Sequence, residues 1–189
     1  MSDERWRCFV AVPLGETLRR DLAAAVDGWR LRLDLAGLRW TDAESWHVTL
    51  AFLGPIEASS VKDLAALLAD GVERHAPVRL PTSGVGAFPS AARARVAWYG
   101  VADLDGALAA LAADVRRAAG VETSEFRGHV TLARARRDPV DLRAWLRDAE
   151  APLGELAVDR VELMRSHLGR GPARYEVLES FTLGVAARV

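Results

Sequence analysis

Two copies of one tetrapeptide hold the residues with the clearest chemical potential in this chain. His47-Val48-Thr49-Leu50 lies in the first half and His129-Val130-Thr131-Leu132 in the second. In an extended strand, side chains two residues apart stand on the same face, about 6.6 Å from each other. Each copy is therefore expected to present a histidine and a threonine together, with the valine and leucine turned into a core.

The chemistry that two such pairs can perform is metal-independent displacement at phosphorus. An unperturbed histidine has a pKa near 6.5, so one imidazole can activate a nucleophile while the other protonates a leaving oxygen. Threonine hydroxyls can donate to the non-bridging oxygens of a phosphate. We predict that His47 and His129 are catalytic, that Thr49 and Thr131 bind the phosphate, and that all four face one cleft.

Two alternatives compete with this interpretation. A single His-x-Thr in a strand is often structural, because the imidazole and the hydroxyl can satisfy each other in a half-buried sheet; its repetition at matching points of the chain favours function. A zinc site needs three or four ligands, and no carboxylate or cysteine lies at a same-face position beside His47 or His129. The chain also lacks a GxGxxG or Walker loop. We therefore expect no metal and no cofactor.

The elements around each tetrapeptide follow one order, which predicts an internal duplication. Apolar spacing and turn residues indicate strand, helix, histidine strand, helix and strand in each half. They cover residues 7–12, 18–33, 46–53, 61–72 and 78–80, then 95–99, 104–115, 128–135, 139–146 and 156–164, with a last strand over 175–183 after a turn at 169–172. We expect a single domain, 1–189, with halves of about 1–90 and 91–189.

The composition is that of a globular protein that needs no disulfide bond or structural metal ion to fold. Half of the 189 residues are hydrophobic, the formal charge is −1, and Cys8 is the single cysteine, which fits a reducing compartment. No run approaches the roughly 18 apolar residues of a membrane helix, and the N-terminus does not read as a signal peptide. We expect a cytoplasmic monomer with no membrane association and no obligate protein partner.

The sequence around both tetrapeptides resembles the two-histidine (2H) phosphoesterase superfamily, and within it the RNA 2',3'-cyclic phosphodiesterases, also called 2'-5' RNA ligases. The likeness covers nearly the whole chain. It is carried by Arg7-Cys8-Phe9-Val10-Ala11-Val12-Pro13, by His47-Val48-Thr49-Leu50-Ala51-Phe52-Leu53-Gly54, by Phe126-Arg127-Gly128-His129-Val130-Thr131-Leu132-Ala133-Arg134, and by Arg165-Ser166-His167-Leu168.

The resemblance implies a bilobal α+β fold, with two antiparallel sheets flanked by helices and the active cleft between the lobes. It implies hydrolysis of a 2',3'-cyclic phosphate to a 2'-phosphate, on RNA ends or small cyclic nucleotides. By the same resemblance, His47 protonates the leaving 3'-oxygen, His129 activates water, and Arg134 adds a charged contact. Two alternatives stay open: 2'-5' ligation of tRNA halves, and a nucleotide- or RNA-binding module without turnover.

Strand parity conflicts with one of these implied roles. Strict alternation puts positions 127, 129, 131 and 133 on the cleft face and Arg134 on the other. Either a bulge or the end of the strand re-aims Arg134, or Arg127 makes the contact instead. The same parity predicts that Trp46 and Phe52 pack in the core and leaves the position of Phe126 open.

Overall fold

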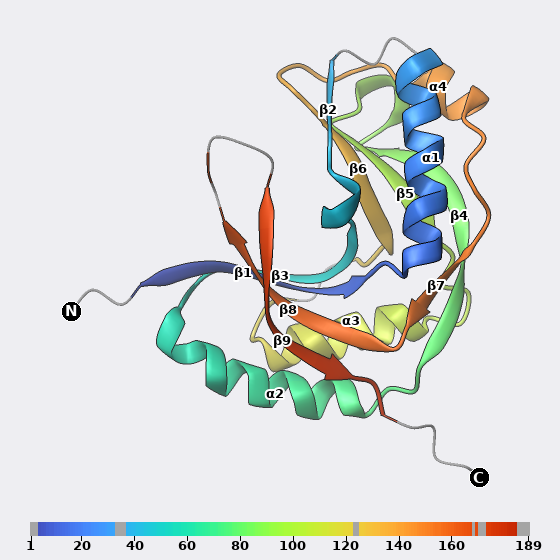
Figure 1. The fold of residues 1–189 in the computed structure, drawn as a ribbon. Coiled ribbons are helices and arrows are strands. Elements are labelled where there is room, and N and C mark those ends of the chain that lie inside the picture. Colours follow the sequence, from blue (N-terminus) through green and yellow to red (C-terminus); the bar gives the residue numbers. More distant parts are fainter. Residues whose placement is uncertain (1–3, 33–36, 123–124, 168, 170–172, 185–189) are drawn as a thin grey trace.

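The computed structural model describes residues 4–32, 37–122, 125–167, 169 and 173–184. Its elements can be followed in chain order in Figure 1. They are β1 (Arg5–Pro13), α1 (Glu16–Arg32), β2 (Leu38–Trp40), η1 (Ala43–Ser45), β3 (His47–Glu57), η2 (Ala58–Ser60), α2 (Val61–Glu73), β4 (Val78–Phe88), η3 (Ala91–Arg93), β5 (Val96–Val101), α3 (Ala107–Ala118), β6 (His129–Ala135), α4 (Arg143–Asp148), β7 (Glu155–Val158), β8 (Arg160–His167) and β9 (Arg174–Thr182).

The strands of the described chain form one curled antiparallel sheet. Eight of them lie in the order β7-β4-β5-β6-β3-β1-β8-β9, and β2 pairs with β6 as a ninth. The predicted α+β class is confirmed, but the expected pair of separate sheets is wrong. The two histidine strands, β3 and β6, pair with each other at Val48 and Val130 and so join what would have been two inner sheet edges. Such pairing satisfies backbone groups that an open edge would leave exposed.

Several predicted boundaries also differ from the structure. Residues 38–40, for which the sequence predicted neither a helix nor a strand, form the short strand β2. The predicted strand 156–164 is two strands, since β7 pairs with β4 whereas β8 pairs with β1. β4 continues to Phe88, with an irregular register between Thr82 and Val85 where Gly84 has a positive φ. Leu33, Leu168 and residues 170–172 of the predicted turn lie outside the described residues.

The helices pack in two pairs. The side chains of Leu18, Leu22, Val26 and Trp29 on α1 are buried, and Trp29 meets Trp145 of α4 edge to face at 5.5 Å. Figure 1 places α1 and α4 near β4, β5 and β6, and it places α2 and α3 together near β8 and β9. Helix α3 also contacts β3, and α2 contacts β9. The sheet therefore keeps one curved face for the core and leaves another for a cleft.

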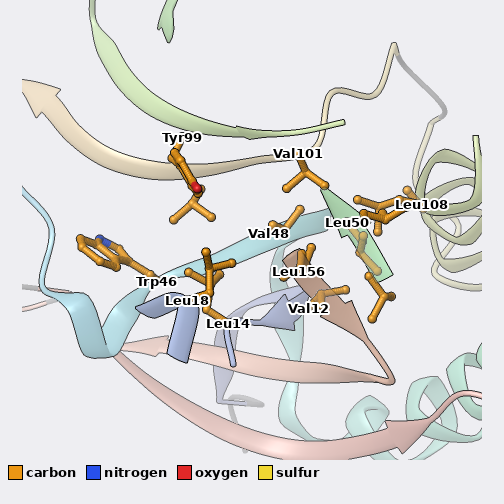
Figure 2. Packing of buried hydrophobic residues seen from close by; sticks show 14 of the residues in the cluster. Val12, Leu14, Leu18, Trp46, Val48, Leu50, Tyr99, Val101, Leu108 and Leu156 are labelled. Atoms are coloured by element: carbon orange, nitrogen blue, oxygen red, sulfur yellow. The ribbon is translucent and has the colours of Figure 1, made fainter. Parts of the chain in front are cut away.

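The core face of the histidine strands is fully apolar. Val48, Leu50, Val130 and Leu132 are at most 1% exposed. Figure 2 shows Val48 and Leu50 pointing among buried side chains of other elements, including Val12, Leu14, Leu18, Tyr99 and Leu156. The predicted alternation is confirmed at these positions, so the histidine and threonine of each strand project from the opposite face.

Candidate active site

The two His-x-Thr pairs lie on adjacent antiparallel strands. Val48 of β3 is the register partner of Val130 of β6. Because the strands run in opposite directions, the histidine end of each tetrapeptide meets the threonine end of the other. The four polar side chains are thus gathered on one face, around an approximate twofold axis through the two valines. The structure brings together the residues that the sequence singled out.

Both imidazoles are fixed in the same way. Nδ1 of His47 lies 2.7 Å from the carbonyl oxygen of Ser45, and Nδ1 of His129 lies 2.7 Å from the carbonyl oxygen of Arg127. A carbonyl only accepts a hydrogen bond, so each Nδ1 carries the proton and donates it. This sets the tautomer and leaves Nε2 of each ring available to a ligand.

Aromatic rings enclose His47. The ring of Phe9 lies 4.8 Å from the imidazole, and the ring of Tyr175 meets it edge-on at 5.3 Å. Burial lowers the pKa of His47 to about 4, with further lowering by the charges of Arg134 and His129 and some opposition from the hydrogen bond to Ser45. Removal from water disfavours the charged imidazolium, so His47 is neutral at pH 7.

His129 has a similar but more open environment. Phe88 meets its ring edge-on at 5.1 Å, and Trp98 lies 6.2 Å away. Burial lowers the pKa of His129, and the neighbouring charges of Arg134 and Arg127 lower it further, against the hydrogen bond to the Arg127 carbonyl. A bound anion would offset the arginine charges at both histidines and favour their protonated forms.

A cleft with two connected hollows lies over these residues. The hollow beside His129 has a volume of about 560 Å³ and the hollow beside His47 about 580 Å³. Both are lined by Thr49, Thr131 and Arg134. The hollows therefore meet over the two threonines, and a phosphate held there would have one imidazole on each side.

A β-bulge aims Arg134 into the cleft. Trp98 of β5 pairs with Thr131, whereas Ala97 pairs with Ala133, so Leu132 is an extra residue in β6. Leu132 and Ala133 are both buried, and Arg134 is exposed on the cleft side. Of the explanations that parity left open, the bulge is the one found.

The same irregularity occurs in β3 and overturns one prediction. Ala11 of β1 pairs with Thr49 and Val10 with Ala51, which makes Leu50 the extra residue. Phe52 is consequently 65% exposed and lines both hollows, so its predicted packing in the core is wrong. The core position of Trp46, which precedes the bulge, is confirmed.

Arg127 and Phe126 lie on the His129 side of the cleft only. The guanidinium of Arg127 is exposed and lies 4.6 Å from the ring centroid of Trp98 and 6.0 Å from that of Phe88. Arg134 lines the part that the two hollows share, so of the two arginines it is the one placed beside both threonines.

Some residues that support the site were not found from the sequence. The carbonyl oxygen of the extra residue Leu50 accepts a hydrogen bond from Nε of Arg116 at 2.9 Å, and that of Leu132 accepts one from the backbone N–H of Thr41 at 2.9 Å. The flanking rings of Phe9 and Trp98 come from strands that pair with the histidine strands. Only the pairing pattern, which the sequence does not display, would have identified them.

The described residues contain no group of three or more His, Cys, Asp or Glu side chains that could hold a metal ion. No helix among them is long and apolar enough to cross a membrane.

Comparisons with known proteins agree with this geometry. A family model described as the 2'-5' RNA ligase superfamily matches residues 18–170. The RNA 2',3'-cyclic phosphodiesterase of Aquifex aeolicus is 30% identical over 154 residues, which are 77% of this chain and 82% of the relative. That of Thermus thermophilus is 32% identical over 187 residues, 94% and 90% of the two chains. The solved structure of E. coli LigT in apo form has a TM-score of 0.76 at 26% identity and covers 96% of this chain and 99% of its own.

Proposed function

Because the chain belongs to the 2'-5' RNA ligase superfamily, we propose that it hydrolyses 2',3'-cyclic phosphates at RNA ends to 2'-phosphates. The observation that carries the proposal is the mirrored pair of His47 with Thr49 and His129 with Thr131 on one face of two adjacent strands. The relatives named as RNA 2',3'-cyclic phosphodiesterases support the same reaction.

The proposed reaction needs one proton acceptor and one proton donor on opposite sides of the phosphorus. His129 takes a proton from water as its oxygen bonds to phosphorus, and His47 gives a proton to the 3'-oxygen as the P–O3' bond breaks. The product keeps its phosphate on O2'. The assignment of donor and acceptor follows the family resemblance, since the two imidazoles are held alike by the carbonyls of Ser45 and Arg127.

The low pKa of His47 fits this scheme when the phosphate is included. With a pKa of about 4, His47 by itself carries almost no proton to donate at pH 7. An anionic phosphate next to the imidazole raises that pKa, because it stabilises the imidazolium and offsets the charge of Arg134. Substrate binding and protonation of His47 are therefore coupled in the proposed mechanism.

The remaining cleft residues would hold the substrate. Thr49 and Thr131 donate to the non-bridging oxygens, and Arg134 neutralises their charge. Phe52 offers an exposed ring on which a nucleobase can stack, with the guanidinium of Arg127 on the His129 side. E. coli LigT has been solved in complex with 3'-AMP, which supports a nucleotide as the ligand.

Two features that β3 and β6 share also support the proposed duplication of the chain. Each histidine is anchored by the carbonyl two residues before it, and an extra residue follows each threonine directly. Two copies of an ancestral unit would account for both coincidences within one domain of residues 1–189.

The deciding experiment is incubation of the protein with a short RNA that ends in a 2',3'-cyclic phosphate, in buffer containing EDTA. We expect a product that has gained one water and whose ³¹P spectrum is that of a 2'-phosphate. The profile of kcat/KM against pH should be bell-shaped with a maximum below about 6.5, since both histidine pKa values are lowered. A 3'-phosphate product, or no turnover, would reject the proposal.

Ligation is the second candidate because the matched family is named for it. Formation of a 2'-5' linkage from a cyclic phosphate and a 5'-hydroxyl end uses the same groups, with the 5'-hydroxyl in place of water. Adding tRNA halves or another RNA with a 5'-hydroxyl to the same assay separates the two outcomes by product length. Tight binding of the cyclic phosphate with neither product over hours would instead indicate a binding module.

A further inference from the structure

Two arginines that the proposed chemistry does not use line the hollow beside His47. Arg7 and Arg39 line this hollow and not the one beside His129. Both are exposed, and neither has a carboxylate or carbonyl partner among the described residues. Many other arginines here are paired, as Arg165 is with Glu4 at 2.8 Å and Arg19 with Glu44 at 2.9 Å.

The position of Arg39 is unfavourable unless an anion is present. Arg39 of β2 is the register partner of Arg134 of β6, and both line the hollow beside His47. Like charges directly opposite each other on neighbouring strands destabilise a sheet. A phosphate between or beside them would turn that repulsion into attraction, since each guanidinium can offer two parallel hydrogen bonds to phosphate oxygens.

The two hollows have different chemical character. The one beside His129 carries Phe88, Phe126 and Arg127, which suit a nucleobase. The one beside His47 adds the hydroxyl-bearing residues Ser166 and Tyr175 to Arg7 and Arg39. This second set suits the oxygens of a sugar-phosphate backbone.

We propose that Arg7 and Arg39 form a second phosphate subsite, which holds the RNA backbone phosphodiester immediately 5' of the cyclic end. The inference rests on the proposed function, in which His47 faces the leaving 3'-oxygen. The ribose attached to that oxygen lies on the same side of the phosphorus, so the chain continues from its 5'-oxygen toward the hollow beside His47. A nucleoside 2',3'-cyclic phosphate has no group for this subsite, whereas a dinucleotide with the same end does.

The test compares kcat/KM for these two substrates. We expect the wild-type protein to prefer the dinucleotide by about tenfold or more, the range for charge-assisted hydrogen bonds to one phosphate. The Arg7→Gln/Arg39→Gln double variant should reduce the ratio of the two kcat/KM values to near one. Arg74 follows α2 directly and lines neither hollow, so Arg74→Gln, which removes one positive charge, should keep the wild-type ratio. Thermal unfolding of each variant checks that it is folded.

A dinucleotide with a neutral methylphosphonate linkage separates the effect of the phosphodiester charge from the effect of the second nucleoside, because it keeps the nucleoside and lacks the charge. The wild-type preference should disappear with this substrate. A wild-type ratio near one, or a ratio that the double variant leaves unchanged, would overturn the subsite.

Failure of the underlying reaction is distinguishable from failure of the subsite. If the wild-type protein hydrolyses neither substrate, the proposed function is rejected, and titration with a 3'-phosphorylated dinucleotide and mononucleotide still compares their affinities. Loss of the dinucleotide's advantage in the double variant would then support the subsite, and an unchanged advantage would reject it.

Discussion

The indole N–H of Trp46 donates to the hydroxyl oxygen of Thr41 at 2.8 Å. The same hydroxyl lies 2.8 Å and 2.9 Å from the carbonyl oxygens of Thr131 and Leu132, which share its single proton in a bifurcated hydrogen bond. Thr41 therefore links the residue that precedes His47 to the bulge that follows Thr131. The spacing of the two half-sites depends on a side chain that belongs to neither.

Thr41→Val should destabilise the protein and reduce turnover. Valine keeps the shape but leaves the buried indole N–H of Trp46 and a carbonyl without this partner, which costs about 1–3 kcal/mol. Urea unfolding gives the free-energy change, and kcat on a cyclic mononucleotide reports the site. In a Trp46→Phe background the same substitution should cost less, because the donor is already absent; an equal cost in both backgrounds would contradict the link.

His47→Gln and His129→Gln should each lower kcat by about 100- to 10,000-fold, the usual contribution of one acid or base. The double variant should lose much less than the product of the single effects, since each histidine works only with the other. His167→Gln is the matched control: His167 is exposed, bonds to Glu176 at 2.8 Å, and lines neither hollow. A fully active single variant would remove that histidine from the mechanism.

The depressed pKa of His47 makes stability dependent on pH. Below about 6.5 the unfolded chain protonates this histidine, whereas the folded protein does so only near pH 4. The free energy of unfolding should therefore fall as the pH drops through this window, by at most about 3 kcal/mol from His47, with His129 acting in the same direction. Urea unfolding at several pH values should show a smaller loss in His47→Gln.

Inorganic phosphate should oppose that loss. Phosphate that binds between the histidines favours their charged forms, so its affinity should increase as the pH falls from 7 to about 5. Titration calorimetry at fixed ionic strength measures this trend, and His167→Gln should reproduce it. A constant affinity would indicate that phosphate binds away from the two imidazoles.

Gly86→Ala should disturb the support of His129. A Cβ at Gly86 would lie 2.1 Å from the ring of Trp98, which is buried next to that histidine. Overpacking of this kind costs about 1–3 kcal/mol, and the displaced ring should also reduce kcat. Gly15→Ala is the control for replacing a glycine by alanine without a steric clash, because a Cβ at Gly15 meets nothing within 4 Å.

Phe52→Ala should raise KM with little loss of stability. Its ring is 65% exposed in the cleft, so truncation removes a stacking surface worth about 1–3 kcal/mol per base and almost no core contact. Steady-state kinetics on a cyclic mononucleotide measures KM, and Phe52→Tyr should retain most of the affinity. A large drop in the free energy of unfolding would instead indicate that Phe52 packs in the core, as strand parity predicted.

The placement of the four central polar residues was predictable from the sequence because it depends only on strand alternation before the bulges. Beyond Thr49 and Thr131 the same rule fails, since the extra residue that follows each threonine reverses the parity of Phe52 and Arg134. A bulge depends on hydrogen bonds supplied from elsewhere, here from Arg116 and Thr41, and no local pattern announces such donors.

The sheet arrangement was less predictable for a related reason. Strand-like patterns over 46–53 and 128–135 indicated two strands but not that they would be neighbours. Their pairing at Val48 and Val130 joins residues that are far apart in the sequence, and it turns the expected two sheets into one. The short strand β2 was missed because three residues give no periodic signal.

The matching Nδ1 anchors at Ser45 and Arg127 have a consequence for the direction of the reaction. Because the same kind of carbonyl holds both rings in the same tautomer, this anchoring assigns neither imidazole as the proton donor or the proton acceptor. By microscopic reversibility, each could serve in the opposite sense when the chemistry runs backwards. Whether such a cleft cuts or joins would then be decided by what occupies the side opposite the ribose, water or another strand's hydroxyl, and by their concentrations.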